Sequence, residues 1–132
     1  MYQQALKGKE NALGPYHTST LSTVNNLGVL YMDQGKLKEA EKMYQRALEG
    51  YKKALGTDHT STLAIASNLG LLYCKQGKPK EAEEMYQRVL EGEEKALGPD
   101  HTLTLTTVSN LGDLYEKQGK LVEADGMYRR AL

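Results

Sequence analysis

The 132-residue chain contains 17 Lys and Arg and 17 Asp and Glu, so its formal net charge at pH 7 is zero. A neutral chain has no net field that attracts nucleic acid or an anionic membrane surface, and no apolar run approaches the roughly 18 residues that a membrane span requires. We therefore expect no nucleic-acid partner and no membrane association.

A single unit of 42 residues is written three times along the chain. Residues 1–42 match 43–84 at 26 of 42 positions, and 43–84 match 85–126 at 28. A fixed period of this size is typical of a solenoid, in which each unit buries its surface against its neighbours. We predict one array over residues 1–132, made of units 1–42, 43–84 and 85–126 and a partial fourth unit at 127–132.

Apolar residues recur at helical spacing throughout, and nothing alternates with the period of two that a strand shows. In the middle unit, the hydroxyl-rich start at Thr60 can cap a first helix. Gly77 and Pro79 mark the turn into a second helix, which Gly98 ends. Applied to every unit, this pattern predicts an all-α chain of seven helices, at residues 2–13, 18–34, 37–55, 60–76, 79–97, 102–118 and 121–132.

The chain has no Trp and no Phe, so its nine Tyr must supply the aromatic volume of the core. We expect each repeated Tyr ring to pack between helices with its hydroxyl at the edge, because a buried hydroxyl needs a partner. The repeated positions hold Tyr31, Tyr73 and Tyr115, and Tyr44, Tyr86 and Tyr128, with Tyr2 in the same register.

A glycine lies inside the second helix of each unit, at Gly8, Gly50 and Gly92. Each costs about 1 kcal/mol relative to Ala in a helix interior. Two explanations stay open: either neighbouring elements approach closely there, or these helices are locally loose.

The first helix of each unit contains Leu-Gly-x-x-Tyr, and the second contains Ala-x-x-x-Tyr. These motifs resemble the tetratricopeptide repeat, with Tyr in place of the usual Phe. The longer unit, with Gln-Gly-Lys at the turn and Leu-Gly-x-Asp-His before the next helix, is similar to the kinesin light chain type, although Tyr16 replaces the Asp in the first copy. The resemblance implies a right-handed superhelix whose concave groove is lined by the first helix of each unit.

On this resemblance, we expect a non-enzymatic scaffold that binds a protein partner or a peptide of mixed polar and apolar character in the groove. The expected groove residues vary between units, apart from one Asn per unit, whose amide has either a packing role or a ligand role. They are Asn25, Asn26, Val29, Met32, Ser67, Asn68, Leu71, Lys75, Ser109, Asn110, Asp113 and Lys117. The alternative is a structural array, self-assembling or acting as a spacer, from a larger protein such as a nucleotide-binding switch protein.

The residues that look most like enzyme components are His17, His59 and His101, which occupy equivalent positions in successive units. Packed helices lie roughly 10 Å apart, too far for shared metal ligation. We therefore expect these histidines to hold backbone groups at the start of the first helix, with a metal or proton-transfer role as the lesser alternative. We expect no catalytic residue and no cofactor, and the lone Cys74, which has no internal disulfide partner, favours a cytoplasmic protein.

Neither end of the chain carries a polar capping element of the kind that closes a repeat array. The apolar residues Tyr2, Ala5, Leu6, Ala12 and Leu13 at one end complement what the other end lacks. These features predict head-to-tail self-association, in which residues 2–13 of one molecule pack on the last unit of another.

Overall fold

The computed structural model describes residues 2–14 and 17–132, without the side chains of Tyr2 and residues 11–13. Over these residues the chain forms seven α-helices and no strand, as predicted. The helices are α1 (Tyr2–Leu13), α2 (Thr18–Asp33), α3 (Leu37–Leu55), α4 (Thr60–Lys75), α5 (Pro79–Leu97), α6 (Thr102–Lys117) and α7 (Leu121–Ala131). The expected contributions of Tyr2, Ala12, Leu13 and Tyr16 lie outside the described side chains.

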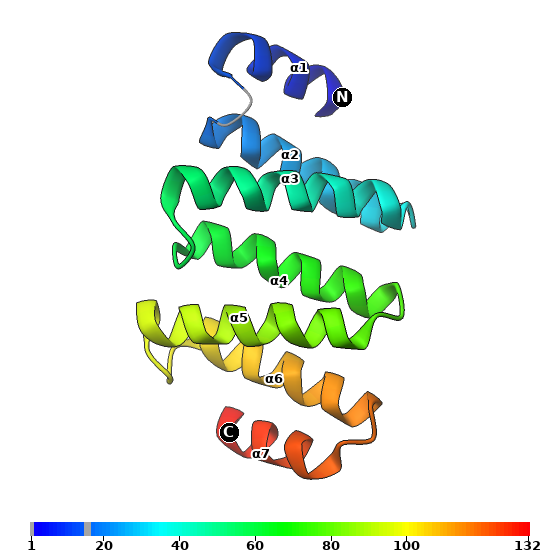
Figure 1. The fold of residues 1–132 in the computed structure, drawn as a ribbon, viewed down its shortest axis with the longest axis vertical. Coiled ribbons are helices and arrows are strands. Elements are labelled where there is room, and N and C mark those ends of the chain that lie inside the picture. Colours follow the sequence, from blue (N-terminus) through cyan, green and yellow to red (C-terminus); the bar gives the residue numbers. More distant parts are fainter. Residues whose placement is uncertain (1, 15–16) are drawn as a thin grey trace.

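The helices stack one after another along the long axis, with α1 at one end and α7 at the other (Figure 1). Each helix packs against the helix that follows it in the chain. From here on, a unit means a first helix together with the second helix that follows it, namely α2 with α3, α4 with α5, and α6 with α7. The result is an all-α superhelical repeat fold. No helix in the described part of the chain combines the length and the apolarity that a membrane crossing requires.

The glycine of each Leu-Gly-x-x-Tyr motif lies directly beneath the tyrosine of the following helix. A Cβ atom at Gly28 would lie 2.7 Å from the ring of Tyr44, and one at Gly70 would lie 2.8 Å from the ring of Tyr86. Atoms do not approach this closely in a packed core. The motif therefore needs glycine because the two helices of one unit approach each other closely at this position.

The glycines inside the second helices have the same explanation at two of their three positions. A Cβ atom at Gly50 would lie 2.4 Å from Leu21, and one at Gly92 would lie 2.7 Å from Leu63. Leu21 and Leu63 are buried, so a close approach, rather than local looseness, explains these two glycines. Among the described residues, no atom outside the backbone of α1 lies within 4 Å of a Cβ placed at Gly8, which serves as a natural control.

The turn before each first helix is fixed by the same two side chains in every unit. The Nδ1 atoms of His17, His59 and His101 accept hydrogen bonds of 3.1 Å from the backbone N–H two residues later. The predicted structural role of these histidines as helix caps is therefore confirmed.

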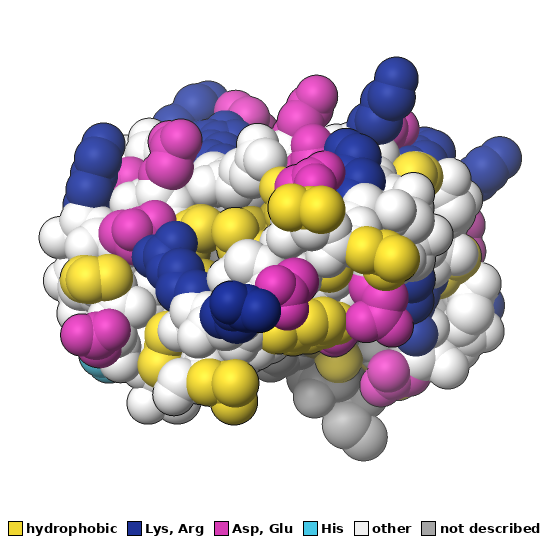
Figure 2. All heavy atoms as spheres, turned by 90° about the horizontal axis from the view of Figure 1, so that it is seen from below, with side chains coloured by type: hydrophobic (Ala, Val, Ile, Leu, Met, Phe, Trp, Pro, Cys, Tyr) yellow, Lys and Arg dark blue, Asp and Glu magenta, His cyan; other side chains and the backbone are white. Residues whose placement is uncertain are grey.

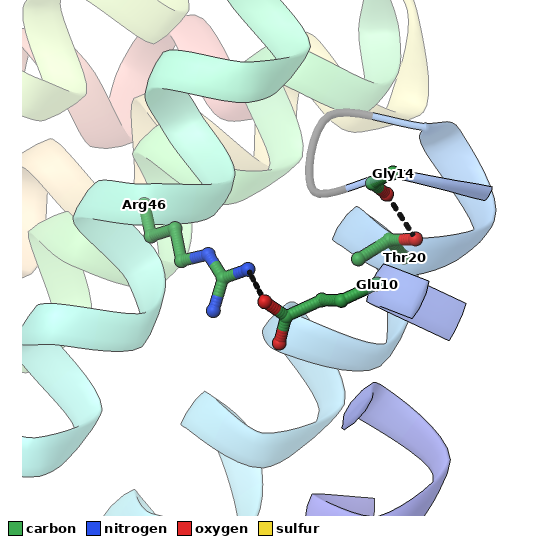
Figure 3. A network of polar contacts seen from close by, with 4 residues as sticks. All are labelled: Glu10, Gly14, Thr20 and Arg46. Atoms are coloured by element: carbon green, nitrogen blue, oxygen red, sulfur yellow. Dashed lines mark hydrogen bonds and ion pairs between the residues drawn. The ribbon is translucent and has the colours of Figure 1, made fainter. Parts of the chain in front are cut away.

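The second side chain at this turn is a buried threonine, three residues after the histidine. Thr20, Thr62 and Thr104 each donate to a glycine carbonyl oxygen at 2.8 Å. Figure 3 shows the first of these bonds, from Thr20 to Gly14. The repeated pair of bonds gives each unit the same orientation relative to the preceding one.

Ion pairs join successive second helices at two of the three equivalent places. Arg46 of α3 contacts Glu10 of α1 at 3.1 Å (Figure 3), and Arg130 of α7 contacts Glu94 of α5 at 2.9 Å. At the place between them the corresponding residues, Lys52 and Arg88, carry like charges.

Candidate binding groove

The twelve expected groove residues all lie on α2, α4 and α6, and none of them is buried. Six are exposed: Asn26, Val29, Leu71, Lys75, Asp113 and Lys117. The other six are half-buried: Asn25, Met32, Ser67, Asn68, Ser109 and Asn110. The exposed set joins apolar and charged side chains, and its most open apolar member, Leu71, is 43% exposed.

One of the three repeated asparagines links neighbouring first helices. The Asn68 amide of α4 donates to Asn25 Oδ1 of α2 at 3.1 Å, which gives Asn68 a packing role. Asn26 is exposed and Asn110 lines a cavity. The three equivalent amides therefore have different environments.

Three neighbouring cavities lie between α4 and α6. The first, of about 200 Å³, lies near the start of both helices and is lined by residues that include Ser67 and Asn68. The second, of about 110 Å³, is lined by residues that include Leu71, Asn110 and Asp113. These cavities therefore follow one another along the two helices.

The third cavity, of about 300 Å³, lies near the end of α4 and α6 and is lined by residues that include Cys74, Pro79 and Lys117. Lys117 also lines the second cavity. Six expected groove residues line none of these three cavities: Asn25, Asn26, Val29, Met32, Lys75 and Ser109.

The repeated tyrosine of the second helix has different polar neighbours in each unit. The Tyr128 hydroxyl donates to the Asp113 carboxylate at 2.5 Å and also lies 3.1 Å from Glu116, and its bond to Asp113 is the main cause of a raised pKa. Burial, followed by the proximity of Cys74, raises the pKa of Tyr86.

Tyr44, the first of these tyrosines, contradicts the expectation that each tyrosine hydroxyl lies at the edge of the core with a hydrogen-bond partner. Tyr44 is fully buried, and its hydroxyl has no hydrogen-bond partner in the described part of the chain. Burial, reinforced by the nearby charge of Asp33, raises the pKa of Tyr44 to about 12. Its unit has Val29 and Met32 where the third unit has Asp113 and Glu116, so the two carboxylates that accept from the Tyr128 hydroxyl have no counterpart beside Tyr44.

Glu93 of α5 is a site residue that sequence reasoning did not identify. Its side chain lines the first cavity, is only 7% exposed, and accepts a hydrogen bond of 2.5 Å from the Thr107 hydroxyl. Burial raises the pKa of the Glu93 carboxyl, and the Thr107 hydrogen bond and the charge of His101 oppose this shift. One signal was available: Glu93 follows Val89 and Leu90 on the apolar stripe of the second helix, where an acid is out of place.

Charge is distributed evenly where the stack is seen from its α7 end. Figure 2 shows hydrophobic side chains scattered among basic and acidic ones, with neither sign of charge gathered into one patch. Among the described residues, no three His, Cys, Asp or Glu side chains are grouped as a metal site would need.

Comparison with known proteins agrees with this architecture. A family model of the tetratricopeptide repeat matches residues 1–53, 19–95 and 61–132, which together span the chain. No curated protein sequence matches it significantly.

Among solved structures, BtubC (BKLC) from P. vanneervenii superposes with a TM-score of 0.88 at 24% identity over 98% of this chain. Two structures of a kinesin light chain-like protein from Podosopora anserina, with nearly identical TPR-like repeats, superpose with TM-scores of 0.84 and 0.82 at 25% identity. The chain covers 51% of BtubC and 61% and 62% of the two P. anserina chains, so it spans only part of each protein.

Proposed function

Because the chain belongs to the tetratricopeptide repeat family, whose members generally mediate protein–protein interaction, we propose that its groove binds a peptide or a partner protein. Proteins of this family are typically non-enzymatic scaffolds. The observation that carries the proposal is the line of cavities between α4 and α6, whose lining includes residues that differ from unit to unit, such as Leu71, Cys74 and Asp113.

The contrast between frame and groove supports this proposal. The histidine caps, the threonine bonds and the glycine contacts recur at equivalent positions with nearly equal distances. The groove instead presents Val29, Leu71 and Asp113 at one equivalent position and Met32, Cys74 and Glu116 at another. A surface that varies on a repeated frame is the part of a solenoid that is free to be specific for a ligand.

The mixed character of the groove indicates the class of ligand. Exposed Val29 and Leu71 offer apolar contacts, while Asp113 and Lys117 offer charges of opposite sign. An extended or helical peptide that alternates apolar and polar side chains can satisfy both kinds of contact. The equal numbers of acidic and basic residues give no support to a nucleic-acid partner.

The test is a binding measurement with a defined probe. A peptide selected from a random phage library on the full chain is titrated against the wild type and against the combined variant Asn25→Ala, Leu71→Ala and Lys117→Ala. We expect the variant to bind at least about 30-fold more weakly, because one central contact alone can contribute 2 kcal/mol.

A matched control carries three alanine substitutions on exposed residues of α5, at Glu81, Glu84 and Lys95. Its affinity should equal that of the wild type. Unchanged affinity in the groove variant, with thermal unfolding unchanged in both variants, would place the binding surface outside the groove and contradict the proposal.

A second candidate function is self-assembly through the α7 end. Leu121 is 66% exposed, Val122 is 82% exposed and Leu132 is fully exposed, and such apolar side chains favour a head-to-tail contact. Sedimentation over a wide concentration range tests this idea, with Val122→Asp expected to weaken association. A strict monomer at the highest concentration would rule it out.

We place the protein in the cytoplasm. The support for this location is Cys74, which is a free thiol and is expected to stay reduced there.

A further inference from the structure

The first cavity between α4 and α6 contains a buried acid. Among the residues that line it, Glu93 is the only one with a charged side chain, and Glu93 as a whole is more than nine-tenths buried. The remaining lining consists of hydroxyl, amide and aliphatic groups, including Ser67, Asn68 and Leu63. The cavity of about 200 Å³ far exceeds the roughly 10–15 Å³ that one water needs on the same measure.

Glu93 and Thr107 have counterparts at the other two junctions between units, and the chemistry of this residue pair differs at each junction. At the α1–α2 junction Lys9 donates to Thr23 at 3.0 Å. At the α3–α4 junction Tyr51 and Ile65 are both buried and fill the position with apolar volume. At the α5–α6 junction it is Glu93 that accepts from Thr107.

The repeated fold therefore does not require an acid at this position, since it also accepts a tyrosine. A carboxylate that has been taken out of water gains strongly from a cation placed beside it. We infer that this cavity binds the ammonium end of a lysine side chain, supplied by the peptide that occupies the groove.

The shape and chemistry of the cavity fit lysine. Leu63 and Leu103 provide aliphatic walls for the methylene stem, and Leu103 is 50% exposed, so it is accessible from the groove. The Thr107 hydroxyl donates a hydrogen bond to Glu93 Oε1, so Oε2 is left to make a single contact with a ligand. A compact ammonium group suits one contact better than the two-pronged guanidinium of arginine.

A calcium ion is a poorer fit, because calcium takes six to eight oxygen ligands. Around Glu93 the cavity offers one carboxylate together with a few hydroxyl and amide oxygens.

The inference rests on the proposed function for the source of the lysine, but its site can be tested separately. The first probe is Nα-acetyl-lysine methylamide, titrated into the full chain while the backbone amide signals of Ser67, Asn68 and Thr107 are followed by NMR. The control probe is Nα-acetyl-norleucine methylamide, which keeps the stem and lacks the charge. We expect saturable shifts with lysine and at least about tenfold weaker binding of norleucine, as expected when a charged hydrogen bond is lost.

Two protein variants complete the test. Glu93→Gln keeps the shape and the acceptor for Thr107 while removing the charge, and should bind the lysine probe as weakly as wild type binds norleucine. Glu93→Tyr combined with Thr107→Ile copies the buried pair of the α3–α4 junction and should abolish the shifts. Equal binding of both probes, no shifts with lysine, or lysine binding unchanged in Glu93→Gln would each overturn the inference.

The phage-selected peptide separates the two proposals. If selected peptides lose affinity in the groove variant yet lack a basic residue, the proposed function stands and the lysine site is wrong. If the lysine probe binds at Glu93 but no peptide binds the groove, the site stands and the proposed function fails.

Discussion

The α3–α4 and α5–α6 junctions have the same frame and different contents. In both, a histidine caps the incoming helix and a threonine binds the glycine carbonyl of the turn at 2.8 Å. Yet Tyr51 and Ile65 fill the first junction, whereas Glu93 and Thr107 line a cavity in the second. The comparison teaches that the same turn recurs at both junctions, while one pair of residues decides whether the junction is filled or contains a cavity.

The largest expected effect comes from moving the acid into the closed junction. Tyr51→Glu should lower the free energy of unfolding by about 3 kcal/mol or more, because it removes a buried ring and leaves a buried carboxylate facing Ile65. Denaturant unfolding at pH 7 measures the cost. Adding Ile65→Thr should recover part of it, by supplying the hydroxyl that Thr107 provides for Glu93.

The same variant has a definite pH dependence. Burial favours the neutral acid in the folded state, so the cost of Tyr51→Glu should shrink as the pH falls and the carboxyl is protonated. A cost below about 1 kcal/mol at pH 7 would show that the frame does not hold this junction closed.

The frame itself is tested by adding one methyl group. Gly50→Ala should destabilise the protein by about 1–2 kcal/mol, because the new Cβ would lie 2.4 Å from Leu21, which is fully buried. Gly8→Ala is the matched control and should stabilise by about 0.5–1 kcal/mol, as nothing lies within 4 Å of it. Equal changes in melting temperature for both variants would contradict the close approach of α2 and α3.

The orphan hydroxyl of Tyr44 gives a prediction of about 1 kcal/mol. Tyr44→Phe should stabilise the protein by that amount at neutral pH, because a buried hydroxyl without a partner is costly. Tyr128→Phe should not stabilise it, since the Tyr128 hydroxyl binds Asp113.

The dependence of stability on alkaline pH gives a second test of the buried Tyr44 hydroxyl. The pKa of Tyr44 is about 12 in the folded state against 10.0 for an ordinary tyrosine, so the unfolded chain loses its proton first. The stabilising effect of this shift is complete below pH 10 and is lost as the pH rises toward 12. Tyr44→Phe should flatten this decline in the free energy of unfolding, and an unchanged slope would contradict the buried position of the hydroxyl.

The smallest expected effect on stability concerns the ion pairs between successive second helices. Lys52→Glu should place an acid opposite Arg88, as Glu10 lies opposite Arg46 and Glu94 opposite Arg130. We expect a gain of about 0.2–1 kcal/mol at low salt, which is the usual range for an exposed ion pair. The gain should fall as salt is added, and a loss of stability would contradict the equivalence of the three positions.

Much of the fold was predictable because the repeats provide internal comparisons. Glycine and proline set the turns, so all seven helices lie within one residue of their predicted bounds at each end. The same equivalence identified His17, His59 and His101 as caps. The groove residues were assigned to α2, α4 and α6 because the family resemblance implies that the first helix of each unit faces inward, and this assignment stays a prediction.

Contacts between units were not predictable from the pattern. The bond from Asn68 to Asn25, the missing partner of Tyr44 and the cavity at Glu93 depend on how deeply side chains reach across neighbouring helices. Helical periodicity gives the face on which a residue lies, but not the volume left between two faces. For that reason Glu93 was overlooked, although an acid on an apolar stripe already marked it.

The most direct test of the central claim is an NMR map of the backbone amide shifts caused by a phage-selected peptide on the full chain. Binding in the groove predicts the largest shifts on α4 and α6, around Ser67, Leu71 and Asp113, with small shifts on the exposed side of α3 and α5. The largest shifts on α3 and α5, with α4 and α6 unchanged, would contradict it.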